Sequence, residues 1–166
     1  HEVFLIFQKE INAEKNSNFF LNKGCKIYEI YIDRHSVNPI KELITFFQIF
    51  KIYNKIKPDI TFHFTIKPNI YGSIIGNLRN ACCVNNVTGM GYFFFTQGIY
   101  KFILFLLYKI SIKQSYHTFF HNSDDAKYFL ENKLILKDNY SIVPGSGVDT
   151  KYYKFCKYPK NTEIKF

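Results

Sequence analysis

Three residues at the junction of a predicted strand and a predicted helix are the first candidates for binding a ligand. Lys67 lies between Thr65 and Asn69, where a β-rich run over residues 59–65 meets a helix expected to open at Pro68. The amino terminus of a helix carries N–H groups without partners, and a cation beside them makes a natural phosphate site. The alternative is a solvated lysine that binds nothing. We therefore take Thr65, Lys67 and Asn69 as candidate substrate-binding residues.

A glycine-rich loop follows the next apolar run. Residues 81–87 predict a strand, and Thr88-Gly89-Met90-Gly91 comes directly after it. Exposed backbone N–H groups in such a loop suit an oxygen-rich ligand, such as a sugar or a phosphate. A simple tight turn is the competing interpretation. Thr88, Gly89 and Gly91 join the candidate substrate-binding residues.

Both candidate segments belong to one predicted βαβ unit over residues 57–92. In an open parallel sheet, ligands bind just beyond the carboxyl ends of the strands, which is where both segments fall. The helix of the unit carries Gly72 and Gly76 four positions apart, and such a pair usually lets a helix approach a sheet closely. His63 lies in mid-strand, so we expect a structural histidine; the functional alternative is support of the loop that begins at Thr65.

Two further helices are predicted around this unit. Asn38 suits an N-cap and Pro39 the first helical position. The helix that follows has apolar residues at spacings of three and four, which indicates one face of a long amphipathic helix. They are Ile40, Leu43, Ile44, Phe47, Phe50, Tyr53 and Ile56. A second helix is expected over residues 97–115; its apolar run falls short of the about 20 residues needed to span a membrane, which leaves a buried or interfacial helix.

Composition limits the function without choosing it. The chain has 166 residues, enough for one domain, and its net charge of +9 favours an anionic partner such as nucleic acid, nucleotide, phosphate or a membrane surface. Neither the pair Gly72 and Gly76 nor the pair Gly145 and Gly147 completes a GxGxxG fingerprint, and the sequence has no GxxxxGK[ST] loop. NAD binding and P-loop nucleotide hydrolysis are therefore disfavoured. Asp124-Asp125 after Asn122 indicates a helix start rather than a metal site, and we predict no metal and no cofactor. Alternating strands and helices, with about six strands, predict an α/β fold with a mainly parallel sheet.

Read in order, these segments resemble a known family. HEVFLIF, KIYEIYIDRHSVNPIKEL, KIKPDITFHFTIKPNIYGS, NNVTGMGY, HNSDDAKYF and IVPGSGVDTKYY together are similar to the amino-terminal half of family 4 glycosyltransferases. The likeness is closest to bacterial members that act on undecaprenyl-diphosphate-linked glycans. The PGSGVD turn resembles the PNGVD-type turn of the family, and Ser146 and Gly147 within it are further candidate substrate-binding residues.

The resemblance implies a Rossmann-like acceptor-side domain of a GT-B enzyme over residues 1–155. Residues 156–166 would form the linker and the start of a donor domain, and the first strand of the family's sheet, with its glycine-rich loop, has no counterpart. Many relatives carry a histidine where this chain has Thr88-Gly89, so the catalytic base stays unknown.

The activity implied is metal-independent transfer of a hexose or N-acetylhexosamine from a nucleotide-sugar donor to a polyprenyl-diphosphate-linked or glycan acceptor. The setting implied is cytoplasmic, with peripheral contact at the inner face of the cell membrane and no nucleic-acid partner. Two alternatives stay open: a non-catalytic truncated remnant that binds glycan or membrane only, and another sugar-nucleotide enzyme of the same architecture, such as a 2-epimerase.

Overall fold

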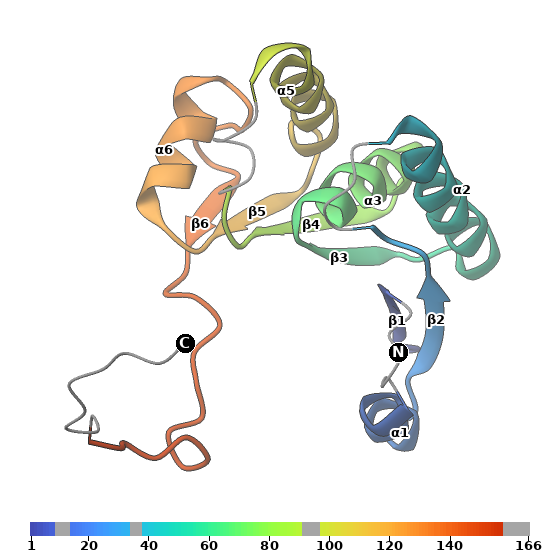
Figure 1. Cartoon of the computed structure of the whole chain (residues 1–166). Coiled ribbons are helices and arrows are strands. Elements are labelled where there is room, and N and C mark those ends of the chain that lie inside the picture. Colours follow the sequence, from blue (N-terminus) through green and yellow to red (C-terminus); the bar gives the residue numbers. More distant parts are fainter. Residues whose placement is uncertain (9–13, 34–37, 91–96, 158–166) are drawn as a thin grey trace.

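The computed structural model describes residues 1–8, 14–33, 38–90 and 97–157, with the backbone alone for 14–16 (Figure 1). Within these ranges the chain is mixed α/β and every paired strand is parallel, which confirms the predicted fold class. Two predicted features fall wholly or mostly outside the described residues, namely Gly91 and the linker and donor-domain start predicted over residues 156–166, of which only 156 and 157 are described.

The strands form two sheets. A two-stranded sheet pairs β1 with β2, and a four-stranded sheet has the order β3-β4-β5-β6. The six strands are β1 (Phe4–Gln8), β2 (Lys26–Ile30), β3 (Ile60–Phe64), β4 (Cys82–Val87), β5 (His117–Phe120) and β6 (Tyr140–Ile142). In this arrangement β1 and β3 each pair on one side only.

Five helices accompany the strands in the described residues. They are α1 (Glu14–Asn22), α2 (Pro39–Ile56), α3 (Ile66–Leu78), α5 (Gly98–Ile112) and α6 (Ser123–Glu131). Helix α3 contacts β3, β4, α2 and α5, and these three helices lie on one side of the four-stranded sheet (Figure 1). The strands β1 and β2 join this body through an apolar cluster in which Ile30 packs with Ile49, Tyr53 and Ile75.

The predicted βαβ unit is present as β3-α3-β4. Its helix begins at Ile66, two residues before the expected start, because Thr65 takes the N-cap position and Pro68 falls within the first turn. Proline is tolerated there since its missing N–H would lack a helical partner in any case. The predicted caps of two other helices are confirmed: Asn38 accepts from the N–H of Ile40, and Asn122 from that of Asp125, at 2.9 and 2.8 Å.

The predicted apolar face of α2 packs against the core over only part of its length. The helix turns Thr45, Ile49 and Tyr53 into the core. Four apolar residues of its first half are exposed instead. They are Ile40, Leu43, Ile44 and Phe47, with exposed fractions of 69%, 56%, 45% and 54%. The predicted face is therefore right for Phe50 and Tyr53 in the second half of the helix, which pack in the core, and wrong for its first half.

Candidate functional site

Three candidate segments end up along one edge of the four-stranded sheet. Because its strands are parallel and neighbours lie about 4.8 Å apart, the segments that follow β3, β4 and β6 share the carboxyl edge. Thr65 and Lys67 follow β3, and Thr88 follows β4. Ser146 and Gly147 come after β6. This is the edge at which open parallel sheets bind ligands.

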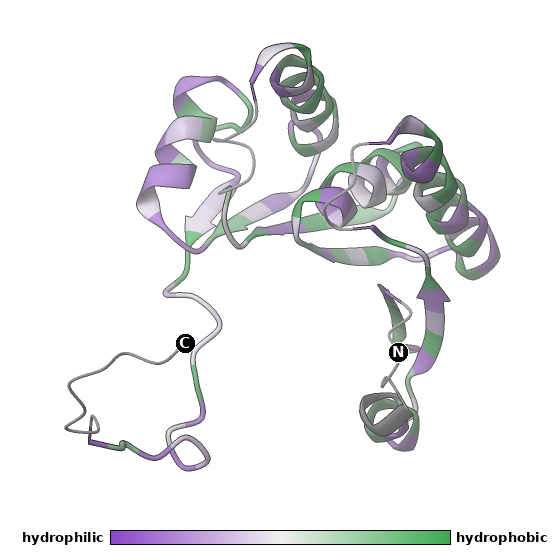
Figure 2. Ribbon diagram, in the orientation of Figure 1, coloured by the Kyte–Doolittle hydropathy of each residue, from purple (hydrophilic) through white to green (hydrophobic). Residues whose placement is uncertain are grey.

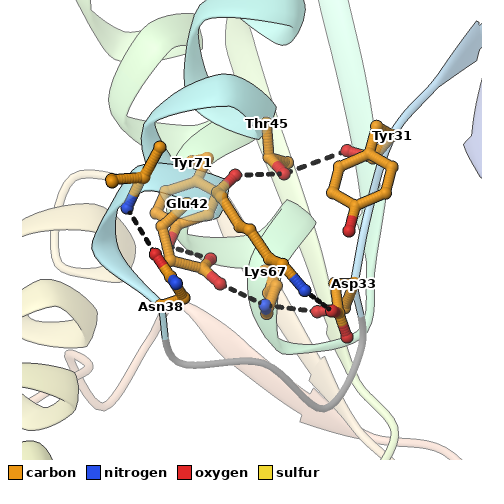
Figure 3. Close-up of polar contacts among 9 residues, drawn as sticks. Tyr31, Asp33, Asn38, Glu42, Thr45, Lys67 and Tyr71 are labelled. Carbon is orange, nitrogen blue, oxygen red and sulfur yellow. Dashed lines mark hydrogen bonds and ion pairs between the residues drawn. The ribbon is translucent and has the colours of Figure 1, made fainter.

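Lys67 is held by partners rather than by solvent (Figure 3). Its Nζ donates to the backbone carbonyl of Asp33 and pairs with Glu42 Oε1 on α2. The opposite oxygen, Glu42 Oε2, accepts from the Tyr71 hydroxyl at 2.7 Å. The Lys67 and Glu42 side chains are only 16% and 19% exposed. The alternative of a solvated lysine is therefore wrong, and an anion at this position would have to compete with Glu42 for the ammonium group.

The same cluster fastens the end of β2 to α2. Lys41 Nζ pairs with Asp33 Oδ2 at 2.8 Å, and the Thr45 hydroxyl donates to the Tyr31 carbonyl at 2.9 Å (Figure 3). Burial, and then the hydrogen bond to Glu42, raises the pKa of Tyr71, so its hydroxyl stays protonated as a donor. Sequence reasoning missed Asp33, Glu42 and Tyr71, because their contacts with Lys67 and with one another bridge separate elements.

Thr65 and Asn69 frame the start of α3 in different ways. Thr65 is exposed and takes φ 70° and ψ 168°, a backbone region that costs a β-branched residue about 1–3 kcal/mol, and its side chain makes no capping hydrogen bond. Asn69 is 1% exposed and donates from Nδ2 to the carbonyl of Asn86 at 2.8 Å. Thr65 is thus accessible to a ligand, whereas Asn69 joins α3 to the end of β4.

Most of the candidate residues described after β4 and β6 are exposed. Thr88 and Gly89 are exposed, while the next residue, Met90, is 1% exposed and anchors the loop in the core. Ser146 and Gly147 are also exposed, and Gly147 takes φ 71°, which favours glycine. The edge therefore presents exposed hydroxyl groups beside exposed backbone.

A buried hydrogen-bond network around His63 joins β3 and β4 to the helices α2 and α3. His63 is 3% exposed; its Nε2 lies 2.9 Å from the Tyr53 hydroxyl and its Nδ1 2.9 Å from Asn85 Oδ1. Ser73 donates to the same Asn85 oxygen at 2.9 Å, and Asn85 Nδ2 donates to Ser115 at 2.7 Å. Since the Asn85 oxygen only accepts, Nδ1 carries the proton and Nε2 accepts from Tyr53. Burial lowers the pKa of His63 to about 4, so the ring is neutral, and the prediction of a structural histidine is confirmed.

The glycine pair of α3 makes this network possible. A Cβ at Gly72 would lie 2.5 Å from the His63 ring, and a Cβ at Gly76 would lie 2.5 Å from Cys83 Sγ. The predicted close approach of helix and sheet is confirmed, and its partners are the inward side chains of β3 and β4. These contacts fix α3, and with it the position of Lys67.

The match to a family model fits this architecture. Residues 1–122, which include β1 through β5, match the model described as glycosyl transferase 4-like. The chain belongs to this glycosyltransferase family. The glycosyl transferase 4-like match covers the β3-α3-β4 unit and the Lys67 cluster, and it confirms the resemblance drawn from the motifs.

A curated relative shares much of the chain. Over 157 residues the chain is 24% identical to the Campylobacter jejuni protein named N,N'-diacetylbacillosaminyl-diphospho-undecaprenol alpha-1,3-N-acetylgalactosaminyltransferase. That alignment covers 92% of this chain and 40% of the relative, so the chain spans less than half of that protein's length.

Proposed function

We propose that this glycosyltransferase-family chain is the acceptor-side part of an enzyme that moves a hexose or N-acetylhexosamine. The donor would be a nucleotide-sugar and the acceptor a polyprenyl-diphosphate-linked or surface glycan. The observation that carries the proposal is the similarity over 92% of the chain to a transferase whose name specifies a diphospho-undecaprenol acceptor. The exposed hydroxyls and backbone of Thr88, Gly89 and Ser146 suit the oxygen-rich head of such an acceptor.

These residues would contribute to the reaction by positioning the acceptor. In transfer without a metal, binding orients the attacking hydroxyl, and fixed dipoles and cations stabilise the leaving diphosphate. The Glu42 carboxylate neutralises the Lys67 ammonium group, so the pair supplies no strong net charge to a ligand. Its role in this proposal is to hold α3 against α2. The exposed loops after β4 and β6 are then the segments that contact the acceptor.

Peripheral membrane contact is the second part of the proposal. Helix α5 exposes Ile99, Phe102 and Leu106, while Tyr108 and Ile112 pack inward. In the described part of the chain, no helix is both long and apolar enough to cross a bilayer. An interfacial helix needs only one apolar face and nearby cations, and lysines near anionic headgroups contribute about 1 kcal/mol each.

A transfer assay on a protein in which this chain is joined to the proposed donor domain tests the activity. We call that protein the complete protein. Purified protein is incubated with nucleotide-activated hexoses and N-acetylhexosamines and an undecaprenyl-diphosphate-linked acceptor, with and without a chelator. We expect one donor to yield a product one sugar heavier by mass spectrometry, and the chelator to leave the yield unchanged. The 166-residue chain alone should give no product. Absence of product from the complete protein with every donor would favour the non-catalytic alternative.

The membrane contact has a separate test. Replacing Lys101, Lys109 and Lys113 by Glu in the complete protein should weaken co-sedimentation with anionic liposomes at low salt and much less at moderate salt. Unchanged co-sedimentation would mean that α5 is not the contact.

A further inference from the structure

His121 is a histidine at the carboxyl edge of the four-stranded sheet to which the proposed function gives no role. It is the first residue after β5, and it opens the segment HNSDDAKYF, whose acids lie at the start of α6. Figure 1 shows β5 between β4 and β6, the two strands that lead to Thr88 and to Ser146. His121 therefore lies in the middle of the edge at which we expect the acceptor to bind.

Hydrogen bonds to both neighbouring strands fix the backbone at His121. Its N–H donates to the carbonyl of Val87 at 3.3 Å, and on the other side the N–H of Val143 donates to the carbonyl of Phe120 at 2.8 Å. Because Val87 pairs with Phe120 in the strand register, the residue after Val87, which is Thr88, lies beside His121. Neighbouring strands are about 4.8 Å apart, so one small ligand can contact both residues.

The side chain of His121 is half-buried, and its ring nitrogens are available to a ligand. Side chains alternate between the two faces of a strand. Phe120 is 0% exposed and packs against Phe129 of α6, so His121 falls on the opposite face of the sheet. His117 shares that face, and its Nε2 lies 3.0 Å from the Ser141 hydroxyl. Within the described part of the chain, no residue forms a hydrogen bond with the ring of His121.

The surroundings of His121 favour a sugar hydroxyl over a phosphate. Helix α6 has Asp124 and Asp125 in its first turn, and its ribbon is largely hydrophilic in Figure 2. These carboxylates offset the attraction of the helix amino terminus for an anion. A neutral imidazole donates from one nitrogen and accepts at the other, and a sugar hydroxyl also does both. Because Glu42 engages Lys67, the ring of His121 offers hydrogen-bonding groups that this lysine does not.

We propose that His121 is an acceptor-binding residue, whose ring hydrogen-bonds to a hydroxyl group of the acceptor's sugar beside Thr88. This rests on the proposed glycosyl transfer and names the part of the acceptor that the carboxyl edge holds. The hydrogen bond orients the acceptor for attack on the donor. Its loss should therefore weaken acceptor binding and leave donor binding unchanged.

Steady-state kinetics of the complete protein separate the two kinds of binding. His121→Phe keeps a planar ring and removes both nitrogens, so the KM for an undecaprenyl-diphosphate-linked acceptor should rise about tenfold while the KM for the nucleotide-sugar stays constant. His121→Gln keeps a donor and an acceptor and should recover most of the loss. The matched control is His117→Gln, at the amino end of the same strand, which should leave both constants unchanged. An unchanged acceptor KM in His121→Phe, or an equal loss in His121→Gln, would overturn the proposal.

Nuclear magnetic resonance of the histidine rings tests the contact without turnover. In the complete protein with isotope-labelled histidine, the signal of His121 is the one that is missing from His121→Gln. A short-chain polyprenyl diphosphate carrying one N-acetylhexosamine should shift this signal and leave that of His117 in place. A shift without any product in the transfer assay would support the contact and refute the transfer. Product without a shift would support the transfer and refute the contact, and the absence of both would refute both.

Discussion

The two faces of β3 differ in how completely the chain fills them. On the side of α3, Thr61 and His63 are 6% and 3% exposed and meet a helix shaped by glycines to receive them. On the opposite side, Ile60, Phe62 and Phe64 are 57%, 63% and 56% exposed. Parallel sheets are normally covered on both faces, so the first face is complete within the chain and the second is not. We call them the helix face and the open face of β3.

The contrast shows which contacts are local. The helix face is closed by β3, α3 and β4, three consecutive elements that any fragment containing the unit keeps. The open face has no cover among the described residues, and β3 also lacks a neighbour on one edge. An exposed apolar edge strand promotes association, so the chain by itself should have low solubility.

The largest effect is expected from filling the helix face. Gly72→Val places side-chain atoms where even a Cβ would lie 2.5 Å from the His63 ring, which Tyr53 and Asn85 hold in place. We expect a loss of about 3 kcal/mol in the free energy of unfolding, or no cooperative folding. Denaturant titration measures it. Gly89→Val, where no atom lies within 4 Å of the added Cβ, is the control and should change stability little.

Lowering the pH should also destabilise the packing on the helix face. The pKa of His63 is about 4 in the folded state and about 6.5 in the unfolded state, so above pH 6.5 the ring is neutral in both states. As pH falls from 6.5 to about 4, the unfolded state binds a proton that the folded state does not bind. The free energy of unfolding therefore falls by about 3 kcal/mol. Unfolding free energy measured across that range should fall, and His63→Gln should remove this part of the slope. An equally steep slope in the variant would locate the titration elsewhere.

A smaller effect is expected on the open face. Ile60→Lys with Phe64→Lys should reduce aggregation of the chain, since lysines on an edge strand oppose pairing between copies. Stability should change by less than about 0.5 kcal/mol per residue, because both side chains are exposed. Light scattering against time measures the association. Leu78→Lys, at a 70% exposed apolar residue of α3, should give no comparable improvement.

Sequence reasoning anticipated the parts of this fold that are coded locally. The caps Asn38 and Asn122 and the glycine spacing in α3 are read from adjacent residues. The strand register cannot be read from adjacent residues. The contacts of His63 with Gly72 and with Asn85 depend on the pairing of β3 with β4.

The candidate site divides in the same way. The segments at the carboxyl edge were predictable, because parallel strands align their ends. The Lys67–Glu42 pair was not, since it joins α2 to α3 across 25 positions. The exposed side of α2 was also unpredictable from periodicity, which cannot tell an inward stripe from an outward one when both are apolar.

The central claim is that the helix face of β3 is complete within this chain whereas the open face is not, and Phe62→Ala tests it most directly. In the 166-residue chain the substitution should lower the free energy of unfolding by less than about 0.5 kcal/mol, because Phe62 is 63% exposed. In the complete protein, where we expect further polypeptide to cover this face, the loss should rise to about 3 kcal/mol or more. A large loss in the chain alone, or an equally small loss in both, would contradict the account.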